Sequence, residues 1–188
     1  MFMKTFLSIA AITILAFTAV SAQKTNDAIS KQIKSLKADK NISLEYDPPS
    51  NSSKIFVRAD NFSDAEAKKA GLQAMNFGMA HTYVGQALPA PPESFDLAFW
   101  ILSKKPRFAA DNTWTVTLAG GTLDLGEARY GAKAREDMEY LNFHISREDL
   151  AKIAAETNVK FKLGEAQFTF TPVQITIFKN VLLITANN

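Results

Sequence analysis

The stretch MEYLNFHISREDLAKIAAETNVKFKLGEAQFTFT, residues 138–171, holds three successive patterns that decide the fold. Apolar residues alternate over 138–145, which predicts a strand. Residues 146–157 then predict a helix that begins after a serine. Residues 159–171 alternate again around Gly164-Glu165, which is typical of a hairpin. This mixture of strands and a short helix favours an α+β fold.

The rest of the chain adds strands on both sides of this stretch. Residues 72–85 follow a helical segment, but Phe77, Met79, His81 and Tyr83 alternate with polar or small residues, so a strand is predicted there. Further strands are predicted at 42–47, 54–59 and 95–103, and in a hairpin over 114–126 that turns at Gly120-Gly121.

The segment FDLAFWILS, residues 95–103, is apolar on both of its faces. Such a strand is expected at the centre of a sheet that is covered on both sides. Residues 86–94 are predicted as a proline-rich loop and 127–137 as a charged linker.

Short helices are predicted at 64–70, 147–156 and 172–184, with a further amphipathic segment within 23–40. The sequence therefore predicts a single α+β domain over residues 23–188, with an antiparallel sheet of about eight or nine strands and short packing helices. A sandwich and a partial barrel are both open alternatives. Because 172–184 is apolar on most sides, it is expected to be buried core; the alternative is an exposed strip that binds a partner.

The first 22 residues have the pattern of a signal peptide. Lys4 precedes an apolar run over 6–20, and Val20-Ser21-Ala22 supplies small residues for cleavage near Ala22-Gln23. A membrane span needs about 20 apolar residues, so a retained anchor is the less favoured alternative. The mature chain is therefore expected to be exported, periplasmic or secreted, and without a membrane span.

Composition excludes several classes of function. Of 21 basic residues, loss of Lys4 leaves 20 against 19 acidic ones, a net charge of +1 that does not favour nucleic-acid binding. The absence of cysteine excludes disulfides and thiol chemistry. Stability must come from core burial, which suits a chain with 47% hydrophobic residues and 14 phenylalanines.

His144, Ser146 and Asp149 look at first like a nucleophile with its base and acid. A serine nucleophile needs a base within hydrogen-bond reach and an oxyanion hole, and no Gly-x-Ser-x-Gly elbow is present. Ser146 stands where a strand becomes a helix, so it is predicted to cap that helix with Asp149 as its partner.

Metal and cofactor chemistry is not expected. His81 and His144 are the only histidines, and neither stands in a zinc-binding spacing. A pairing of the two on adjacent strands is the one remaining route to a metal site. No phosphate loop, dinucleotide fingerprint or calcium loop is present.

Two acidic residues suffice for glycoside hydrolysis, and Asp124 and Glu127 are the candidate pair. The alternative is that they belong to a solvated charged loop. A basic segment, Lys104, Lys105 and Arg107, lies near Phe108 and Trp114, which would suit nucleic acid or an anionic glycan. A charged hairpin end is the favoured interpretation of that segment.

LDLGEARY (123–130) and EYLNFHISREDLAKIAAETNVKFKLGEAQFTFTPVQ (139–174) together resemble a pattern in uncharacterised secreted bacterial proteins. The resemblance covers about the last third of the chain well and the earlier strands loosely. It implies an exported location and a fold, and it assigns no catalytic residue.

Three functions follow as expectations. The leading one is a non-enzymatic binding or interaction protein of the bacterial envelope or extracellular space, with an unknown protein or small ligand as partner. The first alternative is a hydrolase that uses a carboxylate pair, with Asp124, Glu127 and His144 as candidate catalytic residues. The second alternative is a structural subunit of an envelope assembly.

Overall fold

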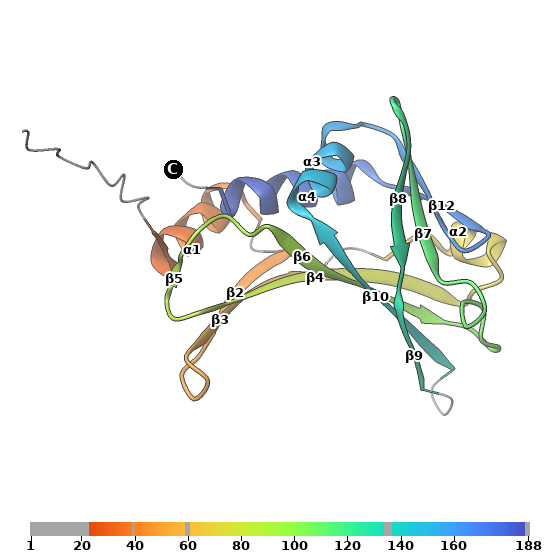
Figure 1. Cartoon of the computed structure of the whole chain (residues 1–188), viewed down its shortest axis with the longest axis horizontal. Helices are drawn as coiled ribbons and strands as arrows, with labels where there is room; N and C mark the ends of the chain where they lie inside the picture. Colours follow the sequence, from red (N-terminus) through yellow and green to blue (C-terminus); the bar gives the residue numbers. More distant parts are fainter. Residues whose placement is uncertain (1–22, 39, 59–60, 134–136, 187–188) are drawn as a thin grey trace, which may run out of the picture.

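A computed structural model describes residues 23–38, 40–58, 61–133 and 137–186. It is an α+β fold of antiparallel sheets and short helices, as predicted (Figure 1). No sheet closes into a barrel within these ranges. The predicted signal peptide, residues 1–22, lies outside the described residues, so its cleavage stays a prediction.

The helices are α1 Asn26–Ser35, α2 Asp64–Lys69, α3 Arg147–Ala155 and α4 Pro172–Ile184. The strands are β1 Lys24–Thr25, β2 Ile42–Asp47, β3 Ser52–Arg58, β4 Ala74–Val84, β5 Ala87–Leu88, β6 Ser94–Leu102, β7 Thr113–Leu118, β8 Gly121–Glu127, β9 Arg129–Lys133, β10 Met138–Ser146, β11 Val159–Leu163 and β12 Ala166–Phe170.

The largest sheet has six strands in the order β2-β3-β4-β6-β10-β9. A second sheet has the order β12-β11-β7-β8, and β1 pairs with β5. Helices α1, α3 and α4 lie on one side of the six-stranded sheet (Figure 1). The four-stranded sheet packs on the same side, where the Phe99 ring lies 5.5 Å from Trp114 and 5.7 Å from Phe161. We call this side the inner face and the opposite side the open face.

The core between the two sheets and α4 is rich in phenylalanine. The Phe161 and Phe170 rings stack with their centroids 4.3 Å apart, and the Phe178 ring of α4 lies 5.2 Å from Phe170. Large aromatic side chains bury much apolar area for little conformational entropy. This core provides the burial that a chain without disulfides requires.

Strand β6 lies at the centre of the large sheet, between β4 and β10, as predicted. Its inner-face residues, from Phe95 to Ile101, are buried. The prediction that it is covered on both sides was wrong, because Ala98, Trp100 and Leu102 are only half-buried on the open face. The helices and the second sheet all pack on the inner face, so nothing among the described elements covers the other one.

Three local predictions need correction. The charged linker 127–137 contains β9, which pairs with β10 and forms one edge of the large sheet. The proline-rich loop 86–94 contains the short strand β5. The first hairpin turns at Ala119-Gly120, because Leu118 pairs with Gly121. Strand β5 pairs with β1, which is distant in the sequence, whereas β9 pairs with β10, the next strand along the chain.

The strand predicted over 72–85 is confirmed as β4, and the hairpin about Gly164-Glu165 is confirmed by β11 and β12. Helix α2 begins after the Ser63 cap, whose hydroxyl accepts the Glu66 N–H at 3.3 Å. It is followed by Gly71 at φ +74°, a conformation that glycine adopts without strain.

Helix α4 is buried core, which confirms the favoured expectation. Thr171 and Gln174 form a complete capping box, and Pro172 opens the first turn. The side chains of Ile175, Ile177, Phe178, Val181 and Ile184 are buried. Only Val173 and Leu183 among its large apolar side chains are exposed, by about half.

The C-terminal end of α4 is held by side chains from elsewhere in the chain. Arg147 donates to the Leu182 carbonyl at 2.7 Å, and Lys24 donates to the Ala186 carbonyl at 3.3 Å. Positive charge is stabilising at this end of a helix. Within the described part of the chain, no helix is long and apolar enough to cross a membrane.

Candidate functional site

Ser146 is a helix cap. Its hydroxyl accepts the Asp149 N–H at 3.0 Å and lies 2.7 Å from an Asp149 carboxylate oxygen. The hydrogen bond from Ser146 lowers the pKa of Asp149. His144 is turned to another partner, since its Nδ1 lies 3.1 Å from Oδ1 of Asp96 on the neighbouring strand. The capping prediction is confirmed. The Ser146 hydroxyl bonds with Asp149 and the His144 ring with Asp96, so the two side chains do not form a nucleophile–base pair.

The two histidines lie on opposite faces of the large sheet. His144 stands on the open face of β10, whereas His81 belongs to β4, with β6 between these strands. The His81 ring stacks on Tyr83 and meets the edge of Phe95. Burial lowers the pKa of His81, with opposing effects from the Ser94 backbone and Asp96. Among the described residues no three His, Asp or Glu side chains gather as metal ligands.

Asp124 and Glu127, the predicted hydrolase pair, both lie exposed on β8. Asp124 accepts the N–H of Gly126 at 2.9 Å, which closes a local turn at a bulge in the strand. The surface hollows described below are lined by other residues. The hydrolase alternative therefore stays a prediction.

The basic segment near Phe108 and Trp114 does not form a stacking site. Both aromatic side chains are buried, at 3% and 0% exposed, so neither ring can receive a ligand. The main-chain N–H of Arg107 donates to Glu139 at 2.9 Å, which ties the segment to β10. Its exposed lysines agree with a charged connection between strands.

Glu139 is a buried carboxylate that the sequence did not reveal as important. It is 2% exposed and accepts hydrogen bonds from the N–H groups of Arg107 and Phe108 and from the Tyr130 hydroxyl. The Ser103 hydroxyl lies 2.9 Å from its other oxygen. The available signal was its position on the same side of the strand as Leu141, Phe143 and Ile145. Its role is to anchor the segment 103–108.

The open face carries a group of aromatic and apolar side chains. Trp100 on β6 stands opposite Tyr140 on β10 and Asn76 on β4. Both rings are half-buried. The indole extends over Gly78, where a Cβ atom would come within 2.6 Å of it. Trp100 and Tyr140 thus form the aromatic platform of this face.

A hollow of about 370 Å³ lies beside the aromatic platform. It is lined by residues of β3, β4, β6 and β10 and of the connection that precedes α2: Phe56, Arg58, Asn61, Asn76, Phe77, Trp100 and Met138. A second hollow of about 530 Å³ lies on the β9 side, lined by Asp96, Arg129, Asn142, Phe143 and His144. The first hollow combines two amide groups with the Arg58 guanidinium group, and the second combines one amide group with the Arg129 guanidinium group and the Asp96 carboxylate.

The cations of the open face lie on both sides of the aromatic platform. Arg58 stands on β3 and Arg129 on β9, and within the described ranges neither guanidinium group has a hydrogen bond or an ion pair. The Lys133 ammonium lies 5.8 Å from the centroid of the Tyr140 ring. Asp96, the acid nearest the centre of this face, is engaged with His144.

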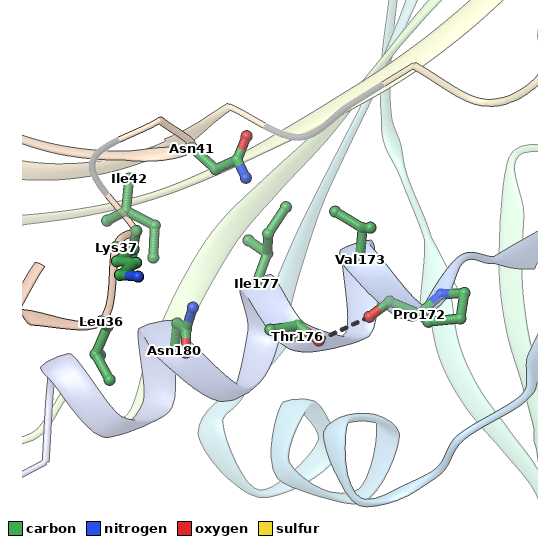
Figure 2. A pocket seen from close by; sticks show the side chains of 10 residues that line it. Leu36, Lys37, Asn41, Ile42, Pro172, Val173, Thr176, Ile177 and Asn180 are labelled. Atoms are coloured by element: carbon green, nitrogen blue, oxygen red, sulfur yellow. Dashed lines mark hydrogen bonds between the residues drawn. The ribbon is translucent and has the colours of Figure 1, made fainter.

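A third hollow, of about 310 Å³, lies between α4 and the connection from α1 to β2. In Figure 2, Val173 and Ile177 point from α4 toward Asn41 and Ile42. The Thr176 hydroxyl is turned back onto the Pro172 carbonyl at 2.8 Å. This groove has one charged residue, Lys37, and no aromatic ring, so it offers a ligand fewer specific contacts than the open face.

Comparisons of the chain with models of protein families, with curated proteins and with solved structures found no match. A functional assignment therefore depends on the chemistry of the open face.

Proposed function

We propose that this chain is an exported, non-enzymatic binding protein of the bacterial envelope or extracellular space, and that it binds its ligand on the open face of the six-stranded sheet. One observation carries the proposal: Trp100 and Tyr140 lie side by side on the face that no described helix or sheet covers. On a protein that buries most of its large aromatic side chains, an accessible aromatic group surrounded by polar and charged side chains is typical of a binding surface.

The position of the aromatic platform supports this function. Trp100 and Tyr140 come from β6 and β10, which are paired on both of their edges and so are held firmly in place. A rigid surface loses little conformational entropy when a ligand binds. The flanking amides of Asn76 and Asn142 supply both donors and acceptors, which orient a polar ligand.

Export is the other half of the proposal. Its support is the pattern of residues 1–22, with Lys4, an apolar run and small residues before Gln23. A chain without cysteine folds equally well in oxidising surroundings, which agrees with this location.

The test is cosedimentation of the purified mature protein with the insoluble envelope material of its host. We expect the wild type to sediment, and Trp100→Ala/Tyr140→Ala to stay in the supernatant. Tyr46→Ala is the matched control, because Tyr46 is a half-buried aromatic residue that stands opposite the buried Ser53, on the inner side of the sheet. Circular dichroism of all three proteins verifies that each is folded. Equal sedimentation of the double variant and the control, or no sedimentation of the wild type, refutes the proposal.

A further inference from the structure

We infer that the ligand of the open face is an acidic oligosaccharide, a chain of uronic-acid units that crosses the strands from Arg58 to Arg129 over the aromatic platform. The inference rests on the proposed function and names the ligand class for the same surface.

The register of the sheet places the two arginines at opposite ends of one row. Arg58 pairs with Gly78, Gly78 with Ala98, Ala98 with Asn142, and Asn142 with Arg129. The row thus crosses five strands, and at about 4.8 Å per strand its ends lie roughly 19 Å apart. A single carboxylate cannot reach both guanidinium groups, so the ligand is a chain that repeats its negative charge.

The middle of this row is suited to a sugar ring. Gly78 and Ala98 have minimal side chains, and the Trp100 indole extends over Gly78 from the neighbouring row. The C–H groups on one side of a pyranose ring are weakly positive and pack against the negative face of an aromatic ring. Asn76 beside Trp100 and Asn142 beside Ala98 can then bind the hydroxyl groups.

Charge on this face favours an anion. The acids of the open face already have partners: Asp96 is hydrogen-bonded with His144 at 3.1 Å, Glu45 stands opposite Lys54 across the strand pair, and Asp47 accepts a hydrogen bond from the Ser50 hydroxyl. Arg58 and Arg129 have no such partner among the described residues. A guanidinium group binds a carboxylate through two parallel hydrogen bonds, which neither a hydroxyl group nor an ester reproduces.

Two other classes of chain suit this face less well. Nucleic acids bind through many neutralised phosphates, and the full chain has a net charge of only +2. Extended peptides usually add to the edge of a sheet, where main-chain groups are free, rather than lie across its face.

The experiment is affinity electrophoresis of the mature protein in gels that contain one polymer each. The uronates are polygalacturonate, alginate and hyaluronan; methyl-esterified polygalacturonate has the same backbone without the charge. A single-stranded oligothymidylate is tested by fluorescence anisotropy. We expect retardation by at least one uronate and weak or no retardation by the ester. Trp100→Ala, Arg58→Gln and Arg129→Gln should each weaken binding about tenfold. Lys160→Gln, which removes an exposed charge from the four-stranded sheet, should leave it unchanged.

Binding to none of the three uronates overturns the inference, as does equal binding of the ester. Binding of the oligothymidylate that is lost in Trp100→Ala overturns it in favour of a nucleic acid. The proposed function is judged separately by cosedimentation: if that still depends on Trp100 and Tyr140, the open face is the binding surface and only the ligand class is wrong.

Discussion

Replacing Glu139 is the sharpest test of how the structure holds its long β6–β7 connection. The carboxylate accepts the N–H groups of Arg107 and Phe108 at 2.9 and 3.0 Å. It also contacts the hydroxyl groups of Ser103 and Tyr130 at 2.9 and 3.2 Å. Glu139→Leu keeps the size of the side chain and removes every acceptor. Glu139→Gln keeps one acceptor oxygen and loses the charge.

The expected cost follows from the groups left without a partner. A buried donor that loses its acceptor costs about 1–3 kcal/mol, and two main-chain N–H groups lose theirs in Glu139→Leu. We therefore expect a loss of about 3–5 kcal/mol in the free energy of unfolding for the leucine variant. The glutamine variant should lose about 1–3 kcal/mol, because hydrogen bonds to a charged group are the stronger ones. Either value is a large part of the stability of a typical domain.

The assay is equilibrium urea unfolding followed by tryptophan fluorescence, since Trp114 is fully buried and reports on the core. Hydrogen exchange at the Arg107 and Phe108 amides reports on the segment itself. Glu156→Leu is the matched control, because Glu156 also accepts a main-chain N–H, that of Ala119, at an exposed site. It should change stability by less than about 0.5 kcal/mol. If Glu139→Leu lies within about 1 kcal/mol of the wild type and both amides stay protected, the anchoring role of Glu139 is refuted.

Four further predictions follow from other parts of the molecule. Ser146→Ala should cost about 0.5–2 kcal/mol in urea unfolding, and Ser146→Asn should restore most of it, because Asn also caps; an Asn variant as unstable as Ala would contradict the cap. Deletion of residues 172–188 should leave the protein unfolded or aggregated by circular dichroism and size exclusion, because it removes the buried face of α4; a folded truncated chain would identify α4 as an interface instead. Burial lowers the pKa of His81 below 6.5, so the unfolded state binds more protons near that pH, and stability should fall as the pH drops from 7.5 to 5.5. His81→Gln should flatten this pH dependence of the unfolding temperature, and an unchanged slope would assign it to other groups. Mass spectrometry of the protein from its host should find Gln23 at the N-terminus, whereas an intact Met1 would contradict export by cleavage.

Local features of the chain were predictable because their causes lie within a few residues of one another. Ser63, Ser146 and Thr171 each cap a helix through an N–H three positions later, so the sequence alone showed where these helices begin. The alternation in 72–85 depends only on the two-residue period of a strand, and it correctly excluded a helix there.

The tertiary structure decided which segments meet and which faces they cover. The residues of β9 are charged and contain a glycine, and only pairing with β10 makes them a strand. Glu139 became an anchor because the fold brings Arg107 and Phe108, distant in the sequence, to its carboxylate. The contacts of Glu139 join segments that are far apart in the sequence, and local periodicity does not contain such contacts.

The same reason explains why the sequence did not predict that Trp100 lies on an open face. The apolar residues on both faces of 95–103 predicted a strand at the centre of a sheet that is covered on both sides. The sequence by itself determined correctly that β6 is central. Which face of β6 receives the helices and the second sheet depends on the packing of α4 and β7, which no pattern within 95–103 encodes. Because both pack on the side of Phe99, the tertiary structure leaves Trp100 on the open face, where it can meet a ligand.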